Sequence, residues 1–222
     1  MGTDDAKTRL LEAAGPIFAE KGFQGASVRE ICDAASVNLA AINYYFGSKE
    51  ALYFAVFRIA HPLMREEDDP FSTVGDLKDM RSEDKLRLII HRVVSHMLGV
   101  DRASWQGRFL IREMLDPTPA CLELLRELLQ QRAKGIQSLL RELLPADTPE
   151  DRIIKMAFSV IGQCIHYRIG DKIMEMLIPA EMKTEYFTPE QIADHIADVC
   201  LAAVGRGPSL AEIINDDYET TK

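Results

Sequence analysis

The sequence predicts an all-α fold. Apolar residues recur at helical spacing along most of its 222 residues, and neither sustained alternating runs nor Asn-Gly or Asp-Gly hairpin turns occur. The Thr-Pro pairs at Thr118, Thr148 and Thr188 each place a capping residue before proline, a pattern that begins helices. With 47% hydrophobic and 27% charged residues, the chain can form one or two packed domains.

The first helix should carry an apolar stripe and stop at Gly22, a residue suited to the left-handed conformation that follows many helices. Pro16 lies inside it and removes one backbone hydrogen bond, so the helix should bend there. A second helix should begin at Ser27, which forms a reciprocal capping pair with Glu30 three residues later.

Two more helices are expected before residue 65. Asn38 is placed to cap a third helix, which runs to about Phe46. Ser48 is placed to cap a fourth, which starts at Lys49 and continues past Phe57.

Residues 61–80 contain two prolines, one glycine and a block of four acidic residues, a composition typical of a connector. We therefore expect two domains, residues 1–60 and residues 61–222. In the larger one, helices are expected at about 82–99, 104–116, 119–144, 149–178 and 189–204.

Composition limits the function. A net charge of −9 argues against a grip on nucleic acid by the whole molecule, because nonspecific affinity comes from Lys and Arg, so any DNA contact must be local. The scattered cysteines predict neither a zinc module nor a disulfide framework. A polar, acidic start and the lack of a run of about 18 apolar residues predict a cytoplasmic protein without membrane contact.

Residues 27–52 have the pattern of a helix-turn-helix, in which the second helix enters the major groove of DNA. The corner at residues 34–37 is made of small side chains and Val37, which permit close helix packing. Ile42 and Phe46, four residues apart, are expected to face inward, which turns Ala40, Ala41 and Asn43 toward the groove.

The segments FQGASVREI, from Phe23 to Ile31, and YYFGSKEAL, from Tyr44 to Leu52, closely resemble the DNA-binding domain of the TetR/AcrR family of bacterial repressors. The resemblance covers about the first 60 residues. It implies a three-helix helix-turn-helix DNA-binding domain over residues 1–60. It also implies that residues 61–222 form a helical regulatory domain that dimerises and binds a small ligand. The segments at 111–125 and 162–168 resemble a subgroup of the same family.

By position, the resemblance assigns phosphate contacts to Ser27, Tyr44, Tyr45 and Lys49, and base contacts to Leu39, Ala40, Ala41 and Asn43. Such proteins grip phosphate mainly through hydroxyls, aromatic edges, backbone amides at helix starts and one Lys, which explains how a segment without Lys or Arg between Arg29 and Lys49 can bind DNA. Asn43 stands where tyrosine is frequent and favours amide readout, as of adenine; Leu39 stands where a polar or basic residue is frequent.

Arg29 and Asn38 complete the candidate DNA set, and several assignments have structural alternatives. Ser27 and Asn38 can serve only as helix caps, and Arg29 can pair with an acidic neighbour. One of the two adjacent tyrosines can pack beneath its helix. The first 57 residues hold seven acidic against five basic side chains, which predicts a shallow salt dependence of DNA binding.

The helices that follow Pro149 and Pro189 each carry an apolar stripe, and two such helices suit a four-helix interface with a second copy. The resemblance supports a homodimer through these helices; an intramolecular core is the alternative. A two-fold pair of reading helices about 34 to 36 Å apart would read a palindrome.

Candidate ligand contacts are aromatic and polar residues that suit a small-molecule pocket between helices, although each one could instead be core. They are Trp105, Phe109, Arg112, Phe158, Gln163, His166 and Tyr167. The sequence holds no recognisable metal, cofactor or catalytic motif, so no metal, no cofactor and no enzymatic activity are expected.

The predicted function is a ligand-responsive transcriptional regulator that binds a double-stranded DNA operator. We expect a repressor that a small hydrophobic or amphipathic effector releases from a palindromic operator. A helical protein-interaction module without DNA binding and a helical enzyme are the alternatives.

Overall fold

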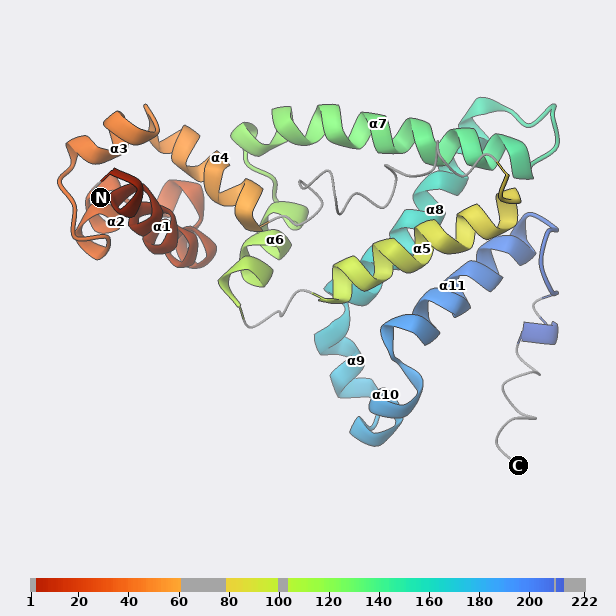
Figure 1. The fold of residues 1–222 in the computed structure, drawn as a ribbon. Helices are drawn as coiled ribbons and strands as arrows, with labels where there is room; N and C mark the ends of the chain where they lie inside the picture. Colours follow the sequence, from red (N-terminus) through yellow and green to blue (C-terminus); the bar gives the residue numbers. More distant parts are fainter. Residues whose placement is uncertain (1–2, 61–78, 100–103, 210, 214–222) are drawn as a thin grey trace. The chain divides into compact units, whose positions relative to one another are not determined.

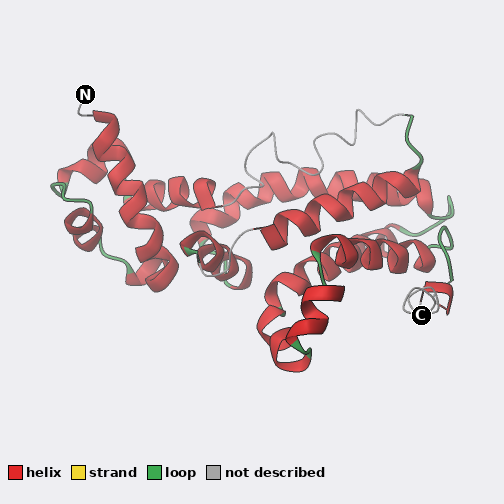
Figure 2. Cartoon of the chain, turned by 60° about the horizontal axis from the view of Figure 1, so that its bottom comes forward, coloured by secondary structure: helices red, strands yellow, loops and turns green. Residues whose placement is uncertain are grey.

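A computed structural model describes residues 3–60, 79–99, 104–209 and 211–213 of the chain. Within these ranges the regular secondary structure is helical throughout, as predicted (Figure 2). The chain divides into two compact units, residues 1–68 with 100–128 and residues 69–99 with 129–222, called unit 1 and unit 2 below.

Unit 1 is a helical assembly built mainly from the amino-terminal part of the chain (Figure 1). Its helices are α1 (Thr3–Gly25), α2 (Val28–Ala34), α3 (Ala40–Tyr45), α4 (Lys49–Ala60), α6 (Trp105–Leu115) and the start of α7 (Pro119–Leu143). Helix α6 packs mainly against α1 and also against α4.

The core of unit 1 joins α1, α2 and α3 to α4 and α6. Phe18, Tyr53 and Phe109 are fully buried in it, and the rings of Phe18 and Phe109 lie 4.6 and 5.0 Å from that of Tyr53. Residues 100–128 therefore group with the amino-terminal helices, whereas the sequence division assigned them to the second domain. Most of the predicted connector, residues 61–78, lies outside the described residues.

Unit 2 contains α5 (Ser82–Gly99), the rest of α7, α8 (Glu150–Ile169), α9 (Asp171–Leu177), α10 (Ala180–Tyr186) and α11 (Pro189–Ala203). Helix α11 lies along α5, and α8 packs on both (Figure 1). Arg87 pairs with Asp198 at this α5–α11 contact, and His91 Nε2 lies 2.8 Å from Asp194 Oδ1. The core between these helices is mainly aliphatic and includes the buried thiols of Cys164 and Cys200.

Three predicted helix boundaries agree with the structure. Gly22 interrupts α1 with φ 69° and ψ −179°. Ser48 Oγ accepts a hydrogen bond from the amide of Ala51 at the start of α4. Thr188 and Gln191 form a reciprocal capping pair at the start of α11.

Three predicted caps are wrong in whole or in part. The N-cap residue of α8 is Pro149 and not Thr148. Ser27 Oγ accepts the Glu30 amide at 3.0 Å, but the Glu30 carboxylate pairs with Lys21 instead of returning to Ser27. Asn38 does not cap α3 with its side chain. The helix begins at Ala40, so its N-cap residue is Leu39.

The helix predicted from 149 to 178 is interrupted. It ends at Gly170, whose amide donates to the His166 carbonyl at 2.7 Å, and α9 follows as a separate helix. Helix α10 was not predicted. Apolar residues continue at helical spacing across this region, so the sequence pattern did not reveal the break. Glycine lowers helix stability, and the chain changes direction at Gly170.

Candidate DNA interface and ligand site

The corner between α2 and α3 depends on one unusual backbone conformation. Ser36 has φ 54°, a left-handed value that short polar residues tolerate better than bulky ones. Its neighbour Ala35 is buried, and Val37 packs against the core of unit 1. The small residues of the predicted corner therefore bring α3 close to α2, as the sequence indicated.

Helix α3 is held by one face and exposed on the other. Ile42 is 1% exposed and anchors the helix in the core, with Phe46 partly buried beside it. On the opposite side, Leu39 and Tyr44 are 54% and 76% exposed, and Asn43 is also exposed. An exposed apolar side chain just before a short helix, with an exposed amide and phenol on it, can contact base edges and backbone in a DNA groove.

The exposure of the other predicted DNA contacts in and just before α3 agrees only partly with the prediction. Asn38 and Ala40 are exposed, whereas Ala41 is half-buried against the core. Tyr45 is the tyrosine that packs partly beneath the helix, and its ring lies 4.8 Å from that of Tyr44 in an edge-to-face arrangement. This contact limits the freedom of the exposed Tyr44 ring.

The first turns of α2 and α4 supply the polar candidates. Ser27 caps α2 and remains exposed, and Arg29 on the same helix is exposed. Lys49 begins α4, and its Nζ lies 4.6 Å from the centre of the Phe23 ring. An ammonium held over an aromatic face is restrained close to the surface, so its position is defined before any phosphate binds.

The candidate ligand residues divide between the two units. Trp105, Phe109 and Arg112 lie on α6 in unit 1, whereas Phe158, Gln163, His166 and Tyr167 lie on α8 in unit 2. Phe109 is fully buried among Tyr53 and Phe57. The structure therefore makes Phe109 a core residue of unit 1.

Trp105 and Arg112 have structural partners on α1. A Cβ atom at Gly15 would lie 2.8 Å from the Trp105 ring, so the absence of a side chain there permits this contact. The Arg112 guanidinium donates a hydrogen bond to the Glu20 carbonyl at 3.0 Å, just before the break in α1 at Gly22. Carbonyl groups at a helix end lack partners within the helix, and a cation there is favourable. These contacts attach α6 to α1.

Glu113 is a residue whose importance the sequence did not reveal. It is 2% exposed and accepts hydrogen bonds from the Tyr53 hydroxyl at 2.5 Å and from the backbone amide and hydroxyl of Thr118 at 3.0 and 3.2 Å. A carboxylate within an apolar stripe was the available signal, because such groups are rarely buried without partners.

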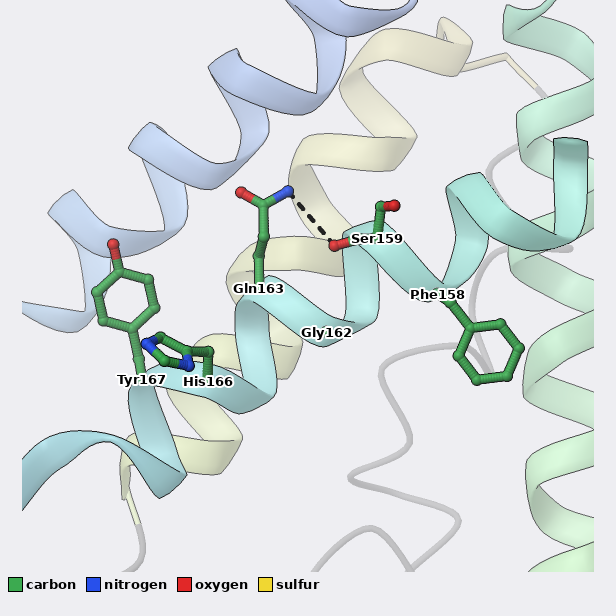
Figure 3. Close-up of a pocket in the computed structure, with 6 residues that line it drawn as sticks. All are labelled: Phe158, Ser159, Gly162, Gln163, His166 and Tyr167. Atoms are coloured by element: carbon green, nitrogen blue, oxygen red, sulfur yellow. Dashed lines mark hydrogen bonds between the residues drawn. The ribbon is translucent and has the colours of Figure 1, made fainter.

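The four candidates on α8 line one shallow hollow together with Ser159 and Gly162 (Figure 3). Its volume is about 570 Å³. Gln163 Nε2 donates to the Ser159 carbonyl at 3.3 Å and to Cys200 Sγ at 3.4 Å, which holds its amide against α8 and α11. Burial raises the pKa of Tyr167, so its hydroxyl stays protonated and able to donate at neutral pH.

Most of the apolar stripe on α8 that suggested a dimer faces the core of its own unit, whereas Ile161 and Ile165 of that stripe are half-buried. Ile153, Ala157, Val160 and Cys164 are buried against α5 and α11, so the intramolecular alternative describes them. A second stripe, one residue further along the chain, includes the exposed side chains of Ile154 and Phe158.

Neither a membrane span nor a metal cluster occurs in the described part of the chain. No helix there is long and apolar enough to cross a membrane. The His, Cys, Asp and Glu side chains described there do not gather in groups of three or more that could hold a metal ion.

Comparisons with known proteins match both parts of the chain. Residues 10–56 match the family model of bacterial regulatory proteins of the tetR family. Residues 82–204 match the model of the C-terminal domain of the HTH-type transcriptional dual regulator CecR.

Two curated relatives align along most of the sequence. The transcriptional dual regulator CecR of Shigella flexneri is 28% identical over 173 residues, which cover 75% of this chain and 77% of the relative. The transcriptional regulator RutR of Escherichia coli O157:H7 is 44% identical over 188 residues and 82% of each protein.

Solved structures share the fold. AibR, in complex with isovaleryl coenzyme A and operator DNA, aligns with a TM-score of 0.59 and 20% identity over 87% of this chain and 97% of its own. A regulatory protein in the tetR family from Rhodococcus RHA1 has a TM-score of 0.59 and 18% identity over 90% and 96%.

Proposed function

The chain belongs to the tetR family of bacterial transcriptional regulators, and from this membership we propose a specific mode of action for it. It is a DNA-binding regulator that acts as a dimer and responds to a small-molecule effector. It binds a palindromic operator in the cytoplasm, represses transcription there, and is released by a small hydrophobic or amphipathic molecule.

The observation that carries the DNA-binding proposal is the two-sided character of α3. Because Ile42 anchors its inner side, Leu39, Ala40 and Asn43 are held outward in a fixed order and are proposed to face base edges. Ala41 is half-buried, so only part of its methyl group remains for a base contact. Asn38 is exposed at the start of this surface and joins the proposed set.

The proposed phosphate contacts lie at the carboxyl end of α3 and in the first turns of α2 and α4. They are Ser27, Arg29, Tyr44, Tyr45 and Lys49. Hydroxyl groups and the backbone amides at helix amino ends donate hydrogen bonds to phosphate without a formal charge, so together with Arg29 and Lys49 they fix the position of the protein on DNA without a large basic patch. This arrangement fits a chain whose net charge is −9.

We place the second copy against the outward stripe of α8. Phe158 is 77% exposed there, and Ile154 is exposed on the same side four residues earlier. A large exposed aromatic side chain on a helix whose other face is already buried is typical of a protein interface.

For the effector, we propose contacts with Gln163, His166 and Tyr167, which line the hollow beside Phe158. The hollow is open in one chain, and a bound molecule would be enclosed only with further cover, since ligand sites bury most of their ligand. Trp105, Phe109 and Arg112 are not proposed as ligand contacts, because they pack in unit 1. AibR, which shares this fold, was solved in complex with isovaleryl coenzyme A and operator DNA.

Selection of bound duplexes from a random DNA pool tests the proposal. Purified protein should enrich a palindrome, and a Lys49→Ala, Tyr44→Ala double variant should enrich it far less, because two backbone contacts per half-site are lost. A Lys155→Ala variant, changed at an exposed ion pair of α8, serves as control. Lack of enrichment by folded, dimeric protein would favour a protein-interaction role for the amino-terminal helices.

The effector contacts are tested with the enriched operator. Molecules that release the wild-type protein should require higher concentrations with Gln163→Ala and Tyr167→Phe, while affinity for the operator stays unchanged. Unaltered release in both variants would place the effector elsewhere.

A further inference from the structure

The helical hairpin formed by α9 and α10, residues 171–186, carries an exposed apolar face. Figure 1 shows this hairpin, called the arm below, after α8 and before α11. Ile173, Met176 and Leu177 on α9 are 61%, 85% and 76% exposed. They are three and four residues apart, so they share one side of the helix. Met182 and Tyr186 form a similar exposed pair on α10.

Ion pairs between α9 and α10 stabilise the arm. Lys183 Nζ on α10 lies 2.7 Å from Asp171 Oδ1 and 3.1 Å from Glu175 Oε1, both on α9. The arm is also attached to unit 2 through Phe187, which packs against its core. These contacts hold α9 and α10 together and do not involve the exposed apolar side chains. The apolar face of the arm is therefore left free to contact a partner.

The apolar face continues a stripe on α8. Exposed or half-buried apolar residues follow one another along α8 at intervals of three or four and lead toward Ile173 across the break at Gly170. They are Ile154, Phe158, Ile161, Ile165 and Ile169. Exposed or half-buried apolar side chains thus recur from Ile154 on α8 to Leu177 on α9, a longer run than the single exposed apolar residues that are common on monomers.

The charge of the arm selects among partners. Residues 171–186 contain four acidic side chains and two lysines. A surface of this charge is repelled by DNA phosphates and by anionic lipid head groups, both of which attract clusters of basic residues. A second copy carries the same acidic side chains, so it is favoured by its apolar surface and not by charge: it is already proposed to lie on the α8 stripe, and it presents apolar side chains of the same kind.

We propose that the arm is part of the dimer interface and extends it from the outward stripe of α8 onto α9 and α10. This inference rests on the dimer in the proposed function. The apolar face of the arm is covered by the second copy, so the two helices between α8 and α11 contribute to dimer affinity as well as linking their neighbours.

Sedimentation velocity over a dilution series of the full chain tests the arm. Met176→Glu combined with Leu177→Glu should raise the dimer Kd at least about 10-fold, because each of two copies loses apolar burial and gains a buried charge. Arg152→Glu changes the net charge by the same amount at an exposed position on another side of α8 and should leave the Kd within about 2-fold. Circular dichroism confirms that each variant is folded.

A Phe158→Glu variant separates the arm from the dimer as a whole. If Phe158→Glu weakens the dimer and the arm variant does not, the arm inference is overturned while the α8 interface remains. If neither variant changes the Kd, both the arm and the α8 interface are overturned. A weaker dimer in the arm variant supports the inference.

Methionine oxidation gives an independent readout on the unchanged protein. In dimers, Met176 should be oxidised by hydrogen peroxide at least about 5-fold more slowly than in protein diluted below the dimer Kd, because the sulfur is covered. Met80, which precedes α5, provides the reference site. Equal Met176 rates at both concentrations, with the dimer verified, would overturn the arm interface.

Discussion

The Tyr53 hydroxyl on α4 donates a hydrogen bond to the buried Glu113 carboxylate on α6, with 2.5 Å between the oxygens. Two donors from Thr118 reach the other carboxylate oxygen of Glu113. Burial, followed by this hydrogen bond, raises the pKa of Tyr53, so the hydroxyl remains a donor at physiological pH. The hydrogen bond between Tyr53 and Glu113 thus joins α4 to α6 within unit 1.

A Tyr53→Phe substitution keeps the ring packing and removes this donor. We expect a loss of about 1–3 kcal/mol in the free energy of unfolding, because one oxygen of a buried carboxylate loses its partner. Urea denaturation measures the loss. Tyr44→Phe, at a 76% exposed ring, should change the free energy by less than about 0.5 kcal/mol. Similar values for the two variants would show that the buried bond contributes little.

Gly22 is expected to tolerate no side chain. Its φ of 69° disfavours L-residues, and a Cβ atom would lie 2.7 Å from the Arg112 guanidinium. Gly22→Ala should destabilise the protein by about 1–3 kcal/mol. Gly47→Ala is the matched control, since Gly47 has φ 81° but no atom within 4 Å of the added Cβ. Denaturation of both variants separates backbone strain from the Arg112 contact, and a smaller loss for Gly22→Ala than for Gly47→Ala would contradict that contact.

Asn43→Ala should relax sequence specificity more than it weakens binding in general. An amide that reads an adenine is worth about 1–3 kcal/mol of discrimination at one base pair. Fluorescence anisotropy with operators altered at each position of a half-site measures this. Lys49→Ala should instead weaken binding to all these duplexes similarly. Unchanged discrimination by Asn43→Ala at every position would exclude direct base readout by this residue.

Operator binding should depend only modestly on salt. Few basic side chains lie in the proposed interface, so the slope of log Kobs against log salt concentration should be shallower than about −8 for the dimer. Titrations between low and moderate salt give the slope. A steeper value would mean that phosphate is gripped mainly by charge.

Stability should decline above pH 9 because of buried thiols. Burial raises the pKa of Cys164 to about 12 and that of Cys200 to about 11, from an ordinary 9.0. Between pH 9 and the raised pKa of each thiol, the thiol is ionised in the unfolded chain but still protonated in the folded chain. The free energy of unfolding that the buried thiol contributes below pH 9 is therefore lost as the pH rises. Each thiol contributes about 1.4 kcal/mol per pH unit.

The thiol contribution is measured by urea denaturation in reductant from pH 8 to 11. A Cys200→Ala variant should show a shallower decline than the wild type, by the contribution of one thiol. The same decline in both proteins would assign the pH dependence to other groups, such as Tyr53.

Local signals in the sequence were sufficient for most helix boundaries and for the exposed side of α3. Capping by Ser48 and Thr188 involves residues three positions apart, and the outward position of Asn43 follows from its spacing to Ile42. These are short-range features. The cap expected from Asn38 and the unbroken helix across Gly170 failed where local preferences alone were ambiguous.

The sequence by itself determined the helical class, the helix-turn-helix and which residues share a helix face. Only the tertiary structure decided what covers each face. It placed Trp105, Phe109 and Arg112 in unit 1, made Glu113 a buried acceptor for Tyr53, and turned the first α8 stripe into core. Periodicity follows from the backbone geometry within one helix, whereas burial depends on helices distant in sequence that pack against it.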